Sequence, residues 1–303
     1  MRIKHEIWAF AFWVFVFGCS SSGSSGGADG VIQDYGNNDA VGADQGADMV
    51  TFRGVFMDFQ SKSPKEGVDL VLLNNDTGEP FDLERYPPFK SGKNGKVELI
   101  LPAGIFVGFK SSGKDTSGFF EFKTTYLFHV ASDEQDRNIY GVNILTYNAA
   151  LSTAFVKLVD PKTLGHLAGT VYYVNEKGEE EFVGCLIVEV LDENGNRLEE
   201  EKDQDGRGIF AAVRYFDTRN DMPTSLQVSS MTHKYNSRYM VANLPKGKYT
   251  VRAKMKDDGS VLSQVTVMAF PDSITIGNMY LRWPEFPSNP TPERDECIGQ
   301  EPQ

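Results

Sequence analysis

The stretch Leu101-Pro102-Ala103-Gly104-Ile105-Phe106-Val107 returns as Leu244-Pro245-Lys246-Gly247-Lys248-Tyr249-Thr250-Val251, and this repeat decides the fold. A proline cannot donate a hydrogen bond to a β-ladder, so each copy ends one strand at its proline. The glycine two residues later supplies a tight bend, after which the apolar residues return as the next antiparallel strand. Two copies therefore predict two β-modules in one chain.

Glycines mark the start of each module. Gly54 in the first half corresponds to Gly169 in the second, and a further glycine, Gly67 or Gly184, precedes the next apolar run in each half. The offset between the copies is 115 residues at the first glycine and 143 at the proline, so the second module is longer. We expect most of the extra residues around 215–235, where the second module would carry an inserted loop.

Short apolar or alternating runs, rich in β-branched and aromatic residues, fill both halves and are separated by Gly, Asn, Asp and Pro. The dipeptides Asn94-Gly95, Asn194-Gly195 and Asp205-Gly206 favour tight hairpins. The predicted fold class is all-β: two tandem small antiparallel β-sandwiches, residues 50–146 and 166–281. The expected strands are 51–58, 68–73, 97–101, 105–109, 119–130, 139–145, 168–174, 185–191, 209–216, 226–230, 238–242, 249–254, 263–269 and 273–281.

The connector between the modules, residues 147–165, departs from this pattern. Apolar residues between Tyr147 and Val159 recur near helical spacing, behind Asn148 as an N-cap and before Pro161 as a stop. The sequence therefore predicts a short helix or turn in the connector.

The N-terminus has the pattern of a secretory signal peptide, residues 1–18. A basic start precedes an apolar run from Ile7 to Gly18, which is too short for a membrane-spanning helix of about 20 residues. The run ends in Val16-Phe17-Gly18-Cys19, which resembles the lipobox of bacterial lipoproteins. The resemblance implies cleavage before Cys19 and a lipid on its thiol, so that the chain is anchored to a membrane.

Residues 19–49 and 282–303 lack the composition of a folded segment. After the cysteine, the first range is rich in Ser, Gly, Asp and Asn and has no Lys or Arg, which predicts a flexible linker that would span on the order of 30 Å. The second range contains five prolines among acidic residues and is predicted to be a disordered tail.

The net charge of −12 repels phosphate backbones, which excludes nucleic acid as a partner and argues against adhesion to an anionic membrane through a basic patch. Besides Cys19, the chain has one cysteine pair, Cys185 and Cys297. An exported compartment permits a disulfide between them. The alternative is that Cys185, within an apolar run, is a buried small hydrophobe.

The order of sequence features in both halves resembles that of the carboxypeptidase regulatory-like domain, a small transthyretin-like (prealbumin-like) β-sandwich. These features are a strand with a central Gly, a strand that begins with Gly and a hydrophobic residue, an Asn-Gly or Asp-Gly turn, and the motif Leu-Pro-x-Gly-x-Tyr-x-Val. The second copy, with Tyr249, matches better than the first. The resemblance covers residues 50–281 and implies an accessory, non-peptidase module.

The histidines and glycines of the chain form no catalytic, metal-binding or nucleotide-binding motif. The four histidines, His5, His129, His166 and His233, show neither HExxH nor HxxE spacing, and no Gly-rich loop with a following Lys occurs. The sequence therefore predicts no catalytic residues, no metal site and no cofactor.

Aromatic residues of the second module give the one hint of a binding site. Tyr215, Phe216, Tyr235 and Tyr239 gather there, with Tyr172 and Tyr173 nearby, and sugar-binding sandwiches present exposed aromatic faces in this way. The alternative is that these rings pack the core. The inserted loop, 217–235, is the expected binding loop, because function concentrates on loops held by a rigid scaffold.

Three functions follow in decreasing order of support. The first is a non-catalytic cell-envelope lipoprotein that acts as a structural or interaction module, the second is a carbohydrate-binding surface lipoprotein, and the third is an envelope hydrolase. Ser20 after the anchor, in place of Asp, resembles export to the outer membrane of a Gram-negative cell. The expected partners are the membrane, through the lipid anchor, and a protein or glycan of the envelope.

Overall fold

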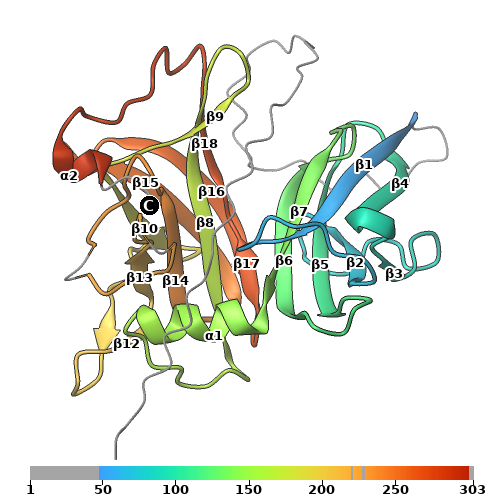
Figure 1. Ribbon diagram of the computed structural model, residues 1–303, viewed down its shortest axis with the longest axis horizontal. Coiled ribbons are helices and arrows are strands. Elements are labelled where there is room, and N and C mark those ends of the chain that lie inside the picture. The colour runs from blue at the N-terminus through green and yellow to red at the C-terminus, as the bar shows by residue number, and fades with distance from the viewer. Residues whose placement is uncertain (1–47, 220, 227–228, 300–303) are drawn as a thin grey trace, which may run out of the picture. The chain divides into compact units, whose positions relative to one another are not determined.

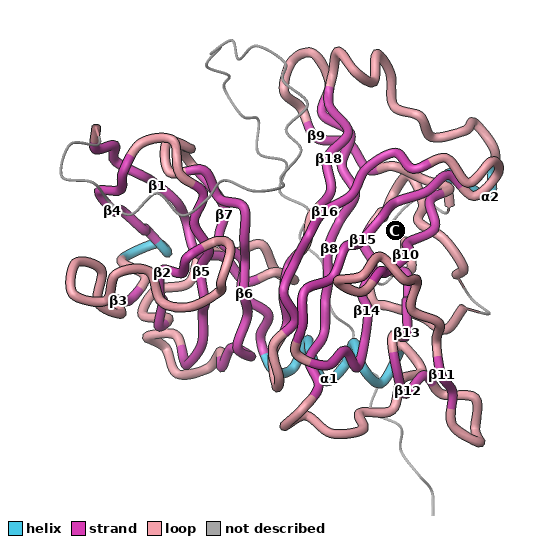
Figure 2. The backbone as a smooth tube through the Cα atoms, turned by 180° about the vertical axis from the view of Figure 1, so that it is seen from behind, coloured by secondary structure: helices cyan, strands magenta, loops and turns pink. Residues whose placement is uncertain are grey.

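The computed structural model of the chain describes residues 48–219, 221–226 and 229–299. These residues form an all-β fold of several sheets, which confirms the predicted fold class (Figure 1). Helices make up a small part of the described chain (Figure 2). None of them has the length and apolar character that crossing a membrane would require.

The elements follow in chain order. The strands are β1 (Met49–Asp58), β2 (Asp69–Asn74), β3 (Phe89–Lys90), β4 (Lys96–Pro102), β5 (Phe106–Lys114), β6 (Glu121–Ala131), β7 (Arg137–Asn143), β8 (Leu164–Val174), β9 (Glu180–Phe182), β10 (Leu186–Leu191), β11 (Glu201–Lys202), β12 (Gly208–Phe210), β13 (Ala212–Tyr215), β14 (Arg238–Pro245), β15 (Gly247–Met255), β16 (Val261–Ala269), β17 (Ile274–Ile276) and β18 (Met279–Arg282). The helices are η1 (Lys93–Gly95), α1 (Ile144–Thr153) and α2 (Asp295–Ile298).

Strands β1 to β7 form the first sandwich. β1 pairs antiparallel with β4 and parallel with β7, and this layer packs on the layer of β2, β5 and β6. Alternate residues of β1 point inward, as a half-buried strand requires. Phe52 packs against Phe109 of β5, and Phe56 meets Phe122 of β6 edge to face. These aromatic pairs form the centre of the first core.

The second sandwich packs the layer β10-β15-β16 on the layer of β13, β14 and β8. Both pairs of the smaller layer are antiparallel. Val188 of β10, Val251 of β15 and Val267 of β16 meet Leu167 of β8 and Val241 of β14 in a second core. Burial of these β-branched and leucine side chains stabilises the layers by about 2 kcal/mol each.

The three residues of β17 join the two sandwiches. β17 pairs in parallel with β6 of the first sandwich and with β8 of the second, and Ile274 lies opposite both Thr125 and His166. One sheet therefore runs β13-β14-β8-β17-β6-β5-β2-β3 through both halves. The first core extends accordingly to Met240 of β14. The repeat predicts two modules, but it does not predict this shared strand.

The glycines of the repeat are points where two backbones approach closely. A Cβ on Gly54 would lie 2.8 Å from the carbonyl oxygen of Arg137, and one on Gly169 would lie 2.1 Å from that of Gly277. The prolines of the repeat are the last residues of β4 and β14, as predicted.

The predicted glycine bend holds for one copy. Gly104 has a φ of 73°, which glycine adopts without strain. In the second copy, Gly247 does not have a positive φ, and the left-handed residue is Asn243, with a φ of 59°. The register of β14 on β8 shifts beside it, between Val241 and Leu244, so the second copy has an irregularity before its proline that the sequence did not predict.

The connector contains helix α1, but the helix begins earlier than predicted. Asn143, rather than Asn148, is its N-cap, and the Asn143 side chain accepts a hydrogen bond from the Thr146 N–H at 2.8 Å. The helix ends at Thr153, well before Pro161, so the proline does not terminate it. Phe155 has a φ of 54°, and Val156 then bridges to Gly208.

The prediction of a disordered tail is wrong for residues 283–299. The Asn289 side-chain amide donates to the Phe182 carbonyl oxygen at 2.9 Å, and the Thr291 hydroxyl accepts from the Gly184 N–H at 2.8 Å. Cys297 of α2 is fully buried. Prolines do remove ladder hydrogen bonds, but side-chain hydrogen bonds and buried contacts hold this segment against β9 and the loop after it.

Three expected strands differ in the structure. The range 209–216 is divided into β12 and β13, and 273–281 into β17 and β18. The expected strand 226–230 lies partly outside the described residues, and its described residues are not in a strand.

We predict that Gly169→Ala lowers the free energy of unfolding by about 3 kcal/mol, because its Cβ would collide with a backbone carbonyl that cannot move alone. Gly247→Ala is the matched control, since its Cβ would meet nothing nearer than 3.4 Å. Urea titration followed by fluorescence measures both. Equal midpoints for the two variants would contradict the close approach.

Cys185 and Cys297 form a disulfide in the structure, which closes a loop with a sequence separation of 112. We predict that the double variant Cys185→Ser, Cys297→Ser is less stable by about 4 kcal/mol in non-reducing denaturation. Dithiothreitol should bring the wild-type protein to the same midpoint and leave the variant unchanged. A variant as stable as the oxidised wild type would show that the bridge contributes nothing.

Candidate functional site

The aromatic residues that the sequence suggests as a ligand platform lie mostly in the interior. Tyr215, Phe216 and Tyr239 are 3%, 6% and 0% exposed, and Tyr235 is half-buried. Tyr215 and Tyr239 belong to the second core, whereas Phe216 packs in the first. A sugar stacks on an exposed ring face, so the described rings of this group do not form such a platform.

Two of these tyrosines hold strands together. The Tyr215 hydroxyl accepts a hydrogen bond from the Val188 N–H at 2.7 Å, on the outer edge of β10. The Tyr239 hydroxyl donates to the carbonyl oxygen of Gly277. Burial raises the pKa of Tyr215 to about 12 and that of Tyr239 further, so both hydroxyls stay protonated at neutral pH. Both hydroxyls therefore form hydrogen bonds with backbone groups.

The inserted loop 217–235 is also built into the fold. The backbone of Thr232 pairs with that of Leu186, and its hydroxyl accepts from the Leu186 N–H at 3.0 Å and donates to the Val183 carbonyl oxygen at 2.8 Å. Asp221 pairs with Arg238 and accepts from the Asn236 amide at 2.9 Å. The described part of the loop thus covers the edge of β10.

A group around Lys62, which the sequence did not indicate, lies where the second half meets the first, since the Arg238 guanidinium is 5.1 Å from the Phe59 ring centroid. The Lys62 ammonium lies 4.3 Å from the ring centroid of Phe59 and 4.5 Å from that of Tyr140. Burial, and next the guanidinium of Arg238, lower the pKa of Lys62 to about 7. The two rings favour the ammonium form and oppose this shift. Fully buried Asp58 fixes the turn by accepting from the Ser61 N–H at 2.9 Å.

These residues come from three separate segments, so no local motif announces them. The group contains a cation, two rings and a carboxylate that is already hydrogen-bonded, and Asn143 donates to that same carboxylate at 2.8 Å. Such a group links loops firmly. The Ser61 hydroxyl also donates to Asp58 Oδ2 at 2.7 Å, and because the same oxygen accepts from the Ser61 N–H, this pair is part of the turn.

A cavity of about 40 Å³ lies beside this group and is lined mainly by apolar side chains, among them Phe59, Met222 and Met240. Cavities of about 150 Å³ are needed to hold benzene. The space is therefore too small for a sugar ring.

Buried His166 lies on the cavity wall. Its Nδ1 accepts from the Asn243 N–H at 3.4 Å, so the proton is on Nε2, which donates to the Tyr147 hydroxyl at 2.9 Å. Burial, and next the charge of Lys123, lower the pKa of His166 to about 4. The histidine is therefore neutral at physiological pH.

The described histidines do not share a site. His129 Nε2 donates to the Thr266 carbonyl oxygen at 2.7 Å, and His233 Nε2 contacts the Ser229 hydroxyl at 3.0 Å. Among the described residues, the one cluster with metal-ligand types is Cys185, Glu296 and Cys297. Its two sulfurs are bonded to each other, so they are not thiolates that could bind a metal.

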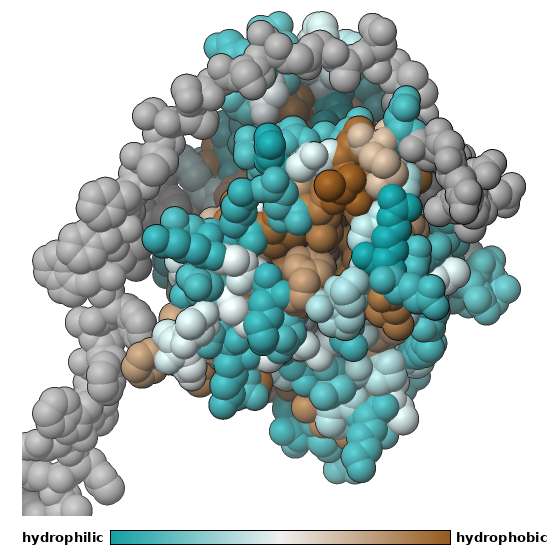
Figure 3. Space-filling view, turned by 90° about the vertical axis from the view of Figure 1, so that its right-hand side faces the viewer, coloured by the Kyte–Doolittle hydropathy of each residue, from teal (hydrophilic) through white to brown (hydrophobic). Residues whose placement is uncertain are grey.

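Figure 3 views the molecule from the side of the first sandwich and shows hydrophobic residues gathered among hydrophilic ones. The exposed large apolar residues of this half are Met49, Leu83, Ile100 and Phe119. Beside Ile100, the outer edge of β4 is partly closed, because the Tyr86 hydroxyl donates to the Ile100 carbonyl oxygen at 3.0 Å and Lys96 pairs with Glu98. Such caps and charges discourage pairing with another strand.

The predicted lipidation site, Cys19, lies outside the described residues, so it stays a prediction.

Comparison with known proteins gives no family. No protein-family model matches the chain, and no curated protein matches it. The resemblance to the carboxypeptidase regulatory-like domain therefore stays a hypothesis.

Solved structures give remote likenesses. The minor pilin GBS52 of Streptococcus agalactiae is 12% identical, with 80% of this chain and 99% of that chain covered and a TM-score of 0.28. The shaft pilin spaA of Lactobacillus rhamnosus GG is 13% identical, with 77% and 98% covered and a TM-score of 0.25. The Bacillus anthracis TIE protein is 9% identical, with 77% of this chain and 34% of that chain covered and a TM-score of 0.23. At TM-scores this low, we base no conclusion on these likenesses.

We predict that His166 makes the fold sensitive to acid. The unfolded chain takes up this proton near pH 6.5 and the folded protein only near pH 4, so stability falls as the pH drops between these values. The difference corresponds to about 3 kcal/mol. In His166→Gln, which cannot titrate, this part of the pH dependence should disappear, whereas Tyr147→Phe should retain it. Denaturant titrations from pH 7 to pH 4 measure the effect, and parallel curves for wild type and His166→Gln would refute it.

Proposed function

We propose that the protein is a non-catalytic, lipid-anchored module of the cell envelope that acts by structural support or interaction. The observation that carries this proposal is the use of the buried polar side chains. Tyr215, Thr232, Tyr239 and Thr275 all bond to strand or turn backbone. An enzyme site needs such groups to face one another around a reacting atom.

The anchor is supported by the sequence. Cys19 follows an apolar run and precedes a linker of Ser, Gly and Asp. One acyl chain binds a membrane reversibly, and two or more bind it for practical purposes permanently. Ser20 in the position after the cysteine favours the outer membrane of a Gram-negative cell.

Glycan capture is less well supported than interaction with a protein or a surface. Three of the four proposed sugar-stacking rings are buried, and the inserted loop covers a strand edge. A hydrolase has the least support, because the Ser229 hydroxyl, which contacts His233 Nε2 at 3.0 Å, is buried and also bonds to the Met231 carbonyl oxygen at 3.0 Å.

Metabolic labelling with an azido fatty acid tests the anchor. The native chain should carry the label, Cys19→Ser should carry none, and Ser20→Ala, as the matched control, should keep it. Membrane fractionation shows in which membrane the labelled chain lies, and Ser20→Asp should move it from the outer to the inner membrane. Equal labelling of Cys19→Ser and wild type would refute the anchor.

A further inference from the structure

Phe155 is a bulky residue held in a strained conformation at the surface. Its φ of 54° lies in the left-handed region, which a large side chain rarely adopts. Its side chain is 45% exposed, and Leu158 and Val159 of the same segment are 38% and 52% exposed. These three residues are called the Phe155 patch below. Strain of this kind persists only where the surroundings enforce it, and it is found at functional positions.

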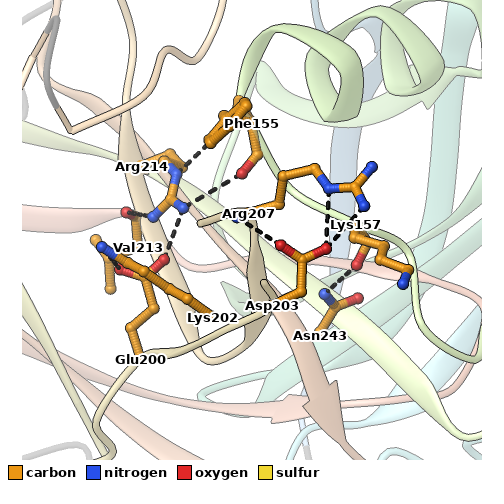
Figure 4. Close-up of polar contacts among 10 residues, drawn as sticks. Phe155, Lys157, Glu200, Lys202, Asp203, Arg207, Val213, Arg214 and Asn243 are labelled. Carbon is orange, nitrogen blue, oxygen red and sulfur yellow. Dashed lines mark hydrogen bonds and ion pairs between the residues drawn. The ribbon is translucent and has the colours of Figure 1, made fainter. Parts of the chain in front are cut away.

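The surroundings of Phe155 do enforce it, as Figure 4 shows. Fully buried Arg214 donates through Nε to the Ala154 carbonyl oxygen at 2.7 Å and through Nη2 to that of Phe155 at 3.5 Å. The same Nη2 pairs with Glu200 at 2.7 Å. The buried guanidinium therefore donates hydrogen bonds to the carbonyl groups at the end of α1. These bonds fix the direction in which the chain leaves the helix.

β12 and β14 hold the next residues. The Gly208 N–H donates to the Phe155 carbonyl oxygen at 3.2 Å, and the Lys157 N–H donates back to the Gly208 carbonyl oxygen at 3.0 Å. The Asn243 amide donates to the Lys157 carbonyl oxygen at 2.8 Å. A Cβ on Gly208 would lie 2.8 Å from Arg214, so a glycine is needed for this arrangement. The backbone of 154–157 is thus rigid.

A rigid, exposed apolar segment points to a contact surface, because strained backbone clusters at functional positions and exposed apolar patches mark protein or membrane contacts. Other exposed apolar residues in the described chain, such as Phe119 and Ile100, do not have a positive φ. The Phe155 patch is therefore the strongest candidate contact surface.

We propose that the Phe155 patch rests on the surface of the lipid bilayer that carries the anchor, an inference that depends on the proposed function. The chain between Cys19 and Asp48 would span on the order of 30 Å as a coil, so the anchored body cannot leave the bilayer surface. Such a leash gives an effective concentration on the order of millimolar, at which a small apolar contact becomes populated.

The charge of the chain selects the type of contact. With a net charge of −12, and with Glu200 and Asp203 on the neighbouring hairpin, attraction to anionic headgroups is not available. The side chains of Phe155, Leu158 and Val159 can instead be buried in the interfacial region of the bilayer. Lys157, exposed within the segment, has a stem long enough to keep its ammonium in the headgroup layer. The contact is thus apolar and suits a zwitterionic surface.

The experiment couples the chain from Cys19 onward to phosphatidylcholine vesicles that contain a maleimide lipid. Cys19 is the free thiol of this chain, because Cys185 and Cys297 are bonded to each other. Trp283 is its one tryptophan, because Trp8 and Trp13 precede Cys19. In a Trp283→Phe background, Phe155→Trp places a single reporter in the patch, and Phe119→Trp places one at a control position that is 86% exposed.

Brominated phosphatidylcholine should reduce the emission of the reporter at 155 roughly twofold and leave the reporter at 119 unchanged, since bromine quenches tryptophan at interfacial depth. Adding Leu158→Ser and Val159→Ser should abolish the quenching at 155. Replacing part of the lipid by phosphatidylglycerol should weaken it.

Equal quenching at both positions, none at 155, or quenching that survives the serine substitutions would each overturn the proposal. Protection of the reporter at 155 by an envelope protein without quenching by lipid would also overturn it, and would assign the patch to a protein partner. Because thiol coupling does not require natural lipidation, a failure here and a failure of fatty-acid labelling are separate results.

Discussion

The structure depends on a short strand that has neighbours on both sides. β17 has three residues, all buried, and its backbone pairs with β6 on one side and β8 on the other. Unpaired N–H and C=O groups at this depth would each cost about 1–3 kcal/mol, so removing β17 would leave two sandwiches with open inner edges. Thr275 adds a hydrogen bond to the Met268 carbonyl oxygen at 2.6 Å, which ties β17 to β16. The two modules therefore share one sheet and part of one core.

Side chains close part of the sheet edges at β10, β4 and β9. Tyr215 and Thr232 cover β10, Tyr86 covers part of β4, and the tail covers β9 through Asn289. These contacts protect the fold from edge-to-edge association, because an open edge pairs with other chains. The polar side chains used in this way have their hydrogen-bonding capacity taken up by the backbone. The strained segment at Phe155 is the exception, since there buried polar groups hold an apolar side chain outward.

The sequence predicted features that depend on neighbouring residues and missed those that depend on residues far apart in the chain. Alternation and turn dipeptides located most strands, because the period of two and the positive φ of Asn-Gly are local properties. The same reasoning misjudged the tail, since proline content says nothing about a distant partner such as Cys185. It also placed the helix cap at Asn148, although Asn143 has the required extended conformation. The aromatic residues near 215 and 239 were visible as a group, but their burial was not.

The sequence by itself determined the all-β class, the two-module repeat and the prolines that end β4 and β14, because these depend on backbone geometry within a few residues. It also carries the pattern around Cys19 from which the anchor is proposed. Only the tertiary structure decided that β17 belongs to both modules, that Arg214 reaches the carbonyls after α1, and that Tyr239 serves the sheet. Each of these joins residues tens to more than a hundred positions apart. Such contacts are selected by burial and by the need to satisfy every buried polar group, which only the folded chain defines.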